Sequence, residues 1–236
     1  MISLITHLKK LKNPAKAKIS QGFFKTGAGH YGEGDIFWGI TVPEQRKVAK
    51  VCLDTSLEEL DELIHNPVHE VRLTSLIILT EQYLRAVKKK DDKAMKKIFD
   101  FYIAHTKAVN NWDLVDCSAP IISGHYTYTY PAKQAVLRKL VKSKNIWERR
   151  IAMVSTLYFI RQKGITLTFD LANDLMKDTH DLIHKAMGWM LREAGKVSEK
   201  ELEQFLEKHV GHIPRTALRY AIERMPEPKR RQYLAR

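Results

Sequence analysis

Apolar residues recur at helical spacing in three long segments of the chain, and this pattern constrains the fold more than any other feature. The segments are residues 68–87, 149–162 and 181–195. In each, the apolar side chains are too dense to form the single stripe of a helix lying on a protein surface. The pattern therefore predicts helices that are covered on more than one side. No segment shows the alternation and tight turns of paired strands, so the sequence predicts an all-α protein.

A weak internal repeat accompanies these helices. Four segments share a basic residue between two apolar positions, and they centre on Arg72, on Arg149 and Arg150, on Lys185 and on Arg215. Arg150 and Lys185 are 35 residues apart, and Lys185 and Arg215 are 30 residues apart. A period of this size is typical of HEAT-like helix pairs, which bury their apolar faces by stacking on their neighbours. We therefore expect a right-handed α-solenoid that forms one domain over the whole chain, 1–236.

The recurring basic residues predict a positively charged surface. Near the starts of the inner helices, they would form a ladder of charge along a concave groove, to which the helix N-termini add partial charge. The chain has 40 Lys and Arg against 27 Asp and Glu, a formal net charge of +13. Such an excess favours a polyanionic partner through counterion release. Duplex DNA fits this groove, and the alternative is that these are ordinary surface side chains.

Several classes of protein are excluded by composition. The chain has two cysteines, Cys52 and Cys117, with no CxxC and no Cys/His pair at zinc spacing. This favours a reducing compartment and argues against a disulfide framework or a structural metal. No apolar run approaches the ~18 residues of a membrane span, and residues 1–18 are typical of an amphipathic first helix, not a signal peptide. We expect a cytoplasmic, nucleoid-associated bacterial protein that is a monomer.

Glycine dominates one segment, residues 24–43. Glycines at positions 27, 29, 32, 34 and 39 exclude a long helix there. The segment is neither a P-loop nor a dinucleotide-binding loop, because the required Lys-Ser/Thr and strand–helix context are missing. It predicts a loop that leads into a helix starting near Pro43 and Glu44, with proline in the first turn.

An aromatic residue and a carboxylate are spaced to share one helix face. Trp112 and Asp116 are four residues apart in NNWDLVD (110–116), so their side chains can meet. Aromatic faces attract cations such as alkylated purines. A nearby carboxylate can stabilise the positive charge that base loss leaves on the sugar, and can orient water. The alternatives are that Trp112 is a core aromatic and that Asp116 is an exposed charge or a helix cap.

Four segments resemble the AlkD-like family of HEAT-like repeat DNA glycosylases, also called DNA alkylation repair enzymes. They are FFKTGAGHYGEGDIFWGITVPEQR (23–46), NNWDLVD (110–116), NIWERRIA (145–152) and IHKAMGWMLREAGK (183–196). Their order and spacing match those of the family. The resemblance implies a monofunctional glycosylase that needs no metal or cofactor, acts on double-stranded DNA with alkylated purines, and leaves the modified nucleotide stacked.

The resemblance also implies roles for individual residues. Asp116 occupies the position of the catalytic carboxylate. Trp112 and Trp189 occupy the two aromatic walls that contact the lesion and its sugar. Phe23 occupies the place of an aromatic residue that lies against the damaged pair from a short helix near the N-terminus. Arg150 occupies the position of a DNA-backbone contact.

Two neighbouring residues have structural predictions. We expect Trp147 to pack between repeats and Asp113 to cap the helix or pair locally.

Two functions share nearly all of these features. The first is a DNA repair glycosylase that hydrolyses the N-glycosidic bond of 3-methyladenine and 7-methylguanine. The second is a non-catalytic HEAT-like repeat protein that binds branched or damaged DNA. They differ at Phe23 and Phe24, and in whether Asp116 does chemistry. A third function, a protein-binding scaffold, predicts an apolar or acidic groove, which the net charge of +13 argues against.

Overall fold

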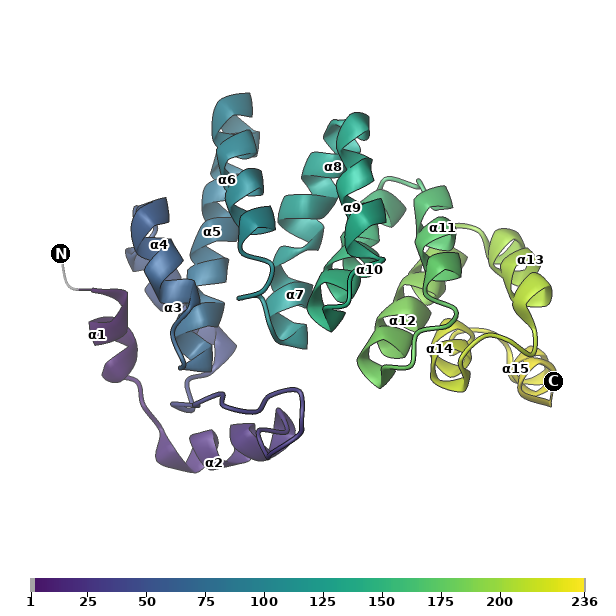
Figure 1. Ribbon diagram of the computed structural model, residues 1–236, viewed down its shortest axis with the longest axis horizontal. Coiled ribbons are helices and arrows are strands. Elements are labelled where there is room, and N and C mark those ends of the chain that lie inside the picture. Colours follow the sequence, from purple (N-terminus) through teal and green to yellow (C-terminus); the bar gives the residue numbers. More distant parts are fainter. Residues whose placement is uncertain (1–2, 236) are drawn as a thin grey trace. The chain divides into compact units, whose positions relative to one another are not determined.

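The computed structural model describes residues 3–235, and helices joined by loops make up its regular structure (Figure 1). Within these residues the β-structure is limited to one isolated bridge between Ile36 and Val68. The prediction of an all-α protein is confirmed. The helices fall into two compact units, one ending at Ser118 and one beginning at Ala119. None of the helices in the described part of the chain has the length and hydrophobicity needed to cross a bilayer.

The first unit is built around one central helix, α5. Its helices are α1 (Leu4–Lys9), α2 (Pro14–Phe23), α3 (Val42–Val51), α4 (Leu57–Ile64), α5 (His69–Lys89), α6 (Asp92–Ala104) and α7 (Trp112–Ser118). Helices α3, α4, α6 and α7 all pack against α5, and the first twelve residues of α5 are buried. The dense apolar segment at 68–87 is therefore covered on several sides, as its pattern predicts.

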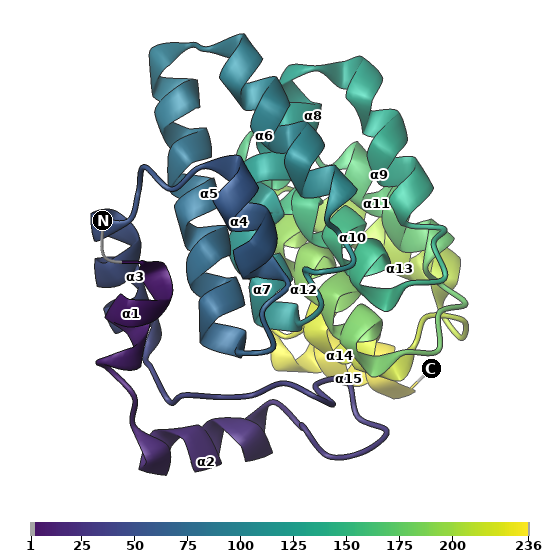
Figure 2. The same ribbon diagram turned by 60° about the vertical axis from the view of Figure 1, so that its left-hand side comes forward.

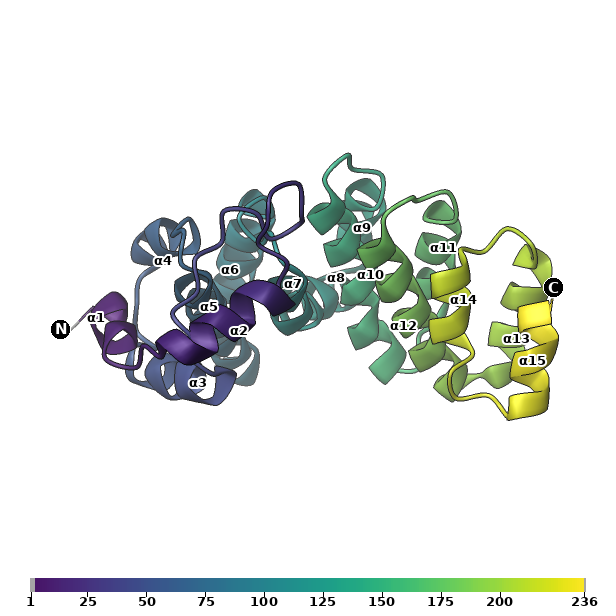
Figure 3. The same ribbon diagram turned by 90° about the horizontal axis from the view of Figure 1, so that it is seen from below.

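The second unit is a series of packed helices. It contains α8 (His125–Thr129), α9 (Gln134–Leu140), α10 (Ile146–Arg161), α11 (Thr166–Asp174), α12 (Asp181–Val197), α13 (Glu199–His209), α14 (Arg215–Ala221) and α15 (Glu227–Ala235), with a π-helical turn at Pro120–Gly124 and a 3₁₀ turn at Pro131–Lys133. Helix α12 packs against α10 on one side and α14 on the other, while α9 and α11 cover α10 and α13 covers α12 (Figure 3). The other two predicted helices correspond to α10 and α12.

The N-terminal segment forms two helices where the sequence analysis expected one. The side chain of Asn13 accepts a hydrogen bond from the Lys16 amide, and Pro14 stands in the first turn of α2. An asparagine cap followed by proline is a strong start signal. The first helix, α1, therefore ends before Asn13, and a second helix, α2, begins at Pro14 and ends at Phe23. No residue of α2 is buried.

The glycine-rich segment is an ordered loop lying against the first unit. Figure 2 shows this segment and α2 on the same side of the unit, below one end of α5. Gly39 has a φ of +77°, and a Cβ placed there would lie 2.2 Å from the carbonyl oxygen of Asn13. Only glycine fits this position, because a side chain would meet both a strained backbone and the start of α2.

Substitution of Gly39 tests whether the loop lies this close to the start of α2. We expect Gly39→Ala to lower the free energy of unfolding by about 3 kcal/mol, because positive φ and steric overlap both act there. Gly34→Ala is the matched control, since Gly34 has a φ of +84° but no atom within 4 Å of its Cβ position; it should lose only about 1 kcal/mol. Urea unfolding of both variants tests this, and equal losses would contradict the packing of the loop on α2.

Candidate functional site

Helix α7 carries the predicted catalytic pair, and its first turn is fixed by the residues on both sides of Trp112. The Asn111 side-chain oxygen accepts from the Trp112 amide at 2.8 Å, and Asp113 Oδ1 accepts from the Leu114 amide at 2.9 Å. The helix buries Leu114 and Val115, whereas Trp112, Asp113 and Asp116 are half-buried. Trp112 and Asp116 are one turn apart on the partly exposed face, as their spacing predicts.

Two phenylalanines from the end of α2 contact the Trp112 ring. Phe24 stacks on the indole with a centroid distance of 5.4 Å and an angle of 12°. Phe23 meets it edge-on at 5.9 Å and is 63% exposed. Phe24 also stacks on Phe37 at 4.9 Å. The structure therefore brings Phe23 to Trp112, and it covers one face of the indole with Phe24.

A buried cluster of charged groups lies behind this aromatic group. The two ring nitrogens of His69 lie 3.1 Å from Asp35 Oδ2 and 2.8 Å from Asp113 Oδ2. Asp35 Oδ1 accepts from Arg72 at 2.7 Å, and Asp35 Oδ2 also accepts from the side-chain Nδ2 of Asn111 at 3.2 Å. The His69 side chain is 2% exposed and that of Asp35 is 8% exposed. Two carboxylates thus face two basic side chains in the interior.

Hydrogen bonding sets the charge state of this cluster. Burial alone would lower the pKa of His69, but its hydrogen bonds to Asp113 and Asp35 outweigh burial and raise that pKa to about 9. For Asp35, burial acts to raise the pKa, while the bonds to His69 and the charge of Arg72 lower it below its ordinary value. Both residues are therefore charged at neutral pH. Asp113, expected to pair locally, also pairs with a residue 44 positions away.

Glu70, next to His69, holds the glycine-rich segment by its backbone. Its carboxylate is buried and accepts hydrogen bonds from three consecutive amides, those of Trp38, Gly39 and Ile40, at 2.7–3.2 Å. These amides satisfy the charge that burial would otherwise leave without hydrogen-bond partners. The first turn of α5 thus fixes the loop both through Glu70 and through the contacts of His69 and Arg72 with Asp35.

Two residues of the expected DNA-binding ladder, Arg72 and Arg150, are buried in the structure. Arg72 is 4% exposed and donates to Asp35 and to the Asn66 carbonyl. Arg150 is 5% exposed and donates to the Leu182 carbonyl at 2.6 Å. In the free protein both guanidiniums bond to the protein's own acceptors, and their contacts with DNA stay predictions.

The remaining residues of the expected ladder are nearer to solvent, and their side chains are paired. Arg149 binds Asp178 at 2.6 Å, and Lys185 pairs with Asp181 at 2.7 Å while remaining 39% exposed. Arg215 is exposed and donates to the Leu234 carbonyl. Trp189 is half-buried on α12. Trp147 is 7% exposed and thus buried, as its predicted packing role requires.

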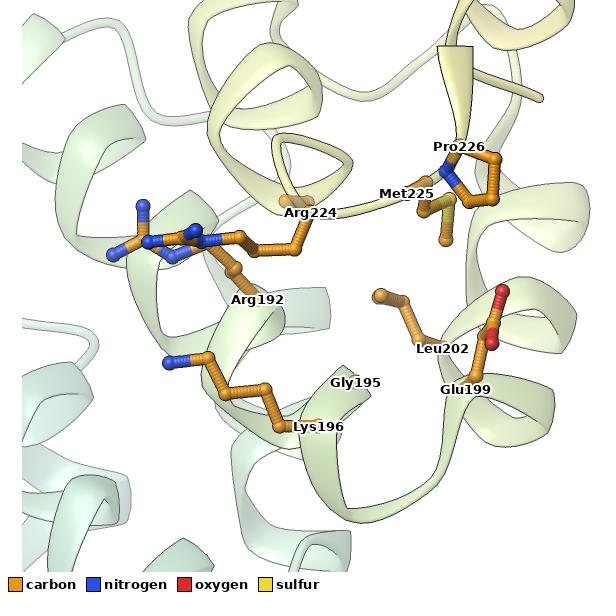
Figure 4. Close-up of a pocket in the computed structure, with 9 residues that line it drawn as sticks. Arg192, Gly195, Lys196, Glu199, Leu202, Arg224, Met225 and Pro226 are labelled. Carbon is orange, nitrogen blue, oxygen red and sulfur yellow. The ribbon is translucent and has the colours of Figure 1, made fainter. Parts of the chain in front are cut away.

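The second unit also contains an open pocket of about 360 Å³ between α12, α13 and the segment after α14. Figure 4 shows Arg192, Lys196 and Arg224 on one side and Glu199 on the other. Arg192 forms an ion pair with Glu223, and Lys196 pairs with Glu193. The positive charge of the pocket is therefore largely neutralised by neighbouring carboxylates. Within residues 3–235, no group of three or more His, Cys, Asp or Glu side chains is arranged to hold a metal ion.

Two signals in the sequence were missed. The chain contains six lysines before its first acidic residue, Glu33, and all six are exposed on or beside α1 and α2: Lys9, Lys10, Lys12, Lys16, Lys18 and Lys25. The second signal is His-Glu-x-Arg at the start of the apolar segment of α5. Charged residues inside a fully buried helix require specific partners, and that requirement points to the cluster at Asp35 and Asp113.

Comparison with known proteins identifies the family. A family model described as DNA alkylation repair enzyme matches residues 4–225. The chain belongs to this family. The structure of this family member is similar to that of a predicted DNA alkylation repair enzyme from Enterococcus faecalis, with a TM-score of 0.72 and 19% sequence identity over 92% of this chain and 97% of that chain. At that identity the likeness shows the fold. None of the curated proteins matches the sequence.

The raised pKa of His69 predicts a pH-dependent stability for this family member. The protonated ring is favoured in the folded state, so its contribution is full below pH 6.5 and is lost as pH rises toward about 9. The gap between these values corresponds to about 3 kcal/mol. We expect the difference in unfolding free energy between the parent and His69→Gln to shrink by about that amount between pH 6.5 and 9. A difference that stays constant over this range would contradict the assignment.

Proposed function

We propose that this protein is a monofunctional DNA glycosylase that hydrolyses the N-glycosidic bond of positively charged alkylated purines, 3-methyladenine and 7-methylguanine, in duplex DNA. The observation that supports it is the arrangement around α7. Trp112 and Asp116 share a partly exposed helix face, and the exposed ring of Phe23 meets the same indole. Membership of the DNA alkylation repair enzyme family agrees with this function.

The chemistry needs only aromatic faces, a carboxylate and water. A cationic base is attracted to an aromatic face such as that of the partly exposed Trp112. As the glycosidic bond breaks, the electron pair goes to the base and positive charge develops on the sugar. The carboxylate of Asp116 stabilises that charge and orients the attacking water. Alkylation has already made the base a good leaving group, so a general acid is not required.

Binding to DNA is assigned to the lysine-rich start of the chain. The six exposed lysines of α1, α2 and the following turn lie on the elements that carry Phe23 to Trp112. Neutralisation of phosphates by such side chains releases counterions and supplies affinity that does not depend on sequence.

The stacked helices fit HEAT-like repeats of a right-handed solenoid with a basic concave groove, which we propose as the fold of the single domain.

The second unit contributes further proposed contacts. Trp189 is a second lesion-contacting aromatic residue, as the resemblance implies. Lys185 and Arg215 are contacts to the DNA backbone, because both side chains reach solvent. Arg149 becomes such a contact only if its ion pair with Asp178 opens.

The alternative function, DNA binding without excision, has one observation in its favour. Phe24 covers one face of the Trp112 indole at 5.4 Å and Phe23 contacts the same ring at 5.9 Å, and these contacts restrict the access of a nucleotide to the indole. A protein of that kind would use the same lysines and would retain affinity for branched or damaged DNA. The two functions are separated by release of the base in a single turnover.

Replacement of the proposed catalytic carboxylate tests the chemistry. We expect Asp116→Asn to slow the single-turnover release of 7-methylguanine from duplex DNA by at least about a hundredfold, because the neutral amide cannot stabilise the sugar cation. The dissociation constant for the same duplex should change less than about twofold, since affinity comes from the phosphates.

The matched control for this variant is Asp100→Asn. Asp100 is a half-exposed carboxylate on α6 that pairs with Lys96, so its loss should leave the release rate unchanged. Equal rates for Asp116→Asn and the parent would refute the role of Asp116. A parent protein that binds DNA but releases no base would support the alternative function.

The lysine-rich segment is tested by the salt dependence of binding. We expect the double variant Lys16→Gln with Lys18→Gln to lower the slope of log affinity against log salt by about 2, since each lost phosphate contact removes about 0.9. The control is Lys88→Gln with Lys93→Gln. These exposed lysines lie at the far end of α5 and the start of α6, about 30 Å along α5 from its first turn. Equal slopes for the two double variants would contradict the assignment.

A further inference from the structure

The first turn of α7 is held on both sides of Trp112 by side chains that converge on one buried histidine. We propose that His69 is a positioning residue, whose protonated ring bridges Asp35 and Asp113 and thereby fixes the Trp112 indole and the Asp116 carboxylate. The catalytic consequence of this inference rests on the proposed glycosylase function. The positioning itself does not depend on activity, because it concerns the contacts of Trp112 in the protein alone.

The bridge requires the charged form of the ring. The two nitrogens of His69 face two different carboxylates, at 3.1 Å and 2.8 Å. A neutral imidazole has one N–H donor and one lone pair, whereas the imidazolium donates from both nitrogens. Only the imidazolium satisfies both carboxylates. With a neutral ring, a lone pair would face either Asp35 or Asp113, and one contact would become repulsive.

The bridge reaches the main chain of Trp112 from both directions. Asp113, which follows Trp112, accepts from His69. Asn111, which precedes it, donates its amide to the same Asp35 oxygen that accepts from His69, and its own oxygen caps the Trp112 amide. The backbone of Trp112 is therefore held between Asn111 and Asp113, which are linked to His69 through Asp35 and directly, respectively. Asp116 lies one turn further along the same short helix, so a shift of that turn moves both functional side chains.

The ring of Trp112 is supported through the same histidine. Phe24 stacks on the indole, and the His69 ring lies 4.8 Å from Phe24 and 4.7 Å from Phe37. A cation next to aromatic rings is favourable, which holds the two phenylalanines against His69. His69 thus contacts both the polar groups that fix the Trp112 backbone and the aromatic group that covers one face of its side chain.

The charges around His69 explain why loss of its proton matters. The groups that face it are Asp35 from the glycine-rich segment, Asp113 from α7 and Arg72 from its own helix. Protonated, His69 and Arg72 balance the two carboxylates. After His69 loses its proton, Arg72 still pairs with Asp35, but Asp113 loses its cationic partner, and the first turn of α7 loses an attractive contact. Replacement of a whole buried ionic cluster by well-packed apolar residues is often neutral for stability, and here the geometry favours a role in fixing one arrangement.

The test uses His69→Gln, which keeps polarity and approximate size but cannot carry the charge. Its matched control is Leu76→Ala, at a buried apolar position two turns further along α5, which destabilises the fold but removes none of the hydrogen bonds of the bridge. Circular dichroism first confirms that both variants are folded at the working temperature. This control separates an effect on Trp112 from a general loss of stability.

The first readout is the ¹⁹F spectrum of protein labelled with 5-fluorotryptophan, with the Trp112 resonance assigned by Trp112→Phe. In the parent and in Leu76→Ala, we expect this resonance to move with pH and a midpoint near 9, as His69 loses its proton. In His69→Gln, we expect it to be displaced or broadened at pH 7 and to show no such midpoint. A Trp112 resonance that is the same in His69→Gln and the parent at every pH would overturn the inference.

The second readout is single-turnover release of 7-methylguanine at pH 7. We expect His69→Gln to lower the rate constant at least tenfold with a DNA dissociation constant within twofold of the parent, while Leu76→Ala keeps the parent rate. A His69→Gln rate equal to that of the parent would overturn the catalytic consequence. If the parent itself releases no base, the proposed function fails, and the ¹⁹F spectra still decide whether His69 positions Trp112.

Discussion

The imidazole ring of His69 is the point where three parts of the first unit meet. It lies in the first turn of α5, faces Asp35 from the glycine-rich segment and faces Asp113 from α7. Neither the loop nor the seven-residue α7 is long enough to hold its position by its own backbone hydrogen bonds. Both are fixed by contacts with the buried, rigid start of α5. The placement of Trp112 and Asp116 therefore follows from a charge balance in the interior.

Buried and exposed charges have different roles in this protein. The buried ones, Glu70 and Arg72 among them, bond to backbone amides, carbonyls and opposite charges, and they determine which segments meet. The exposed ones include the lysines of α1 and α2, which remain available to a polyanion. A net charge of +13 does not distinguish these roles. The burial of each side chain distinguishes them, because a guanidinium bonded inside the protein contributes little to counterion release on binding.

The helices and the face shared by Trp112 and Asp116 could be predicted from the sequence, because helical periodicity is a local property. The same spacing placed Arg72 and Arg150 near the starts of helices but could not show that their side chains turn inward. The partners of His69 lie 34 and 44 residues away, and no local pattern reports contacts at that range. Asn13 and Pro14 are a capping signal that predicts the break between α1 and α2. The amphipathic pattern of residues 1–18 continues across this signal and favoured a single helix instead.

The protonation of His69 at neutral pH is the claim on which the positions of Trp112 and Asp116 depend, and NMR of the histidine ring nitrogens tests it most directly. With ¹⁵N-labelled histidine, the account predicts that both ring nitrogens of His69 carry protons at pH 7, giving two slowly exchanging downfield N–H resonances absent from His69→Gln. A single protonated nitrogen at pH 7 would contradict it. One of the two carboxylates would then lack a donor, and the first turn of α7 would have to be held by other contacts.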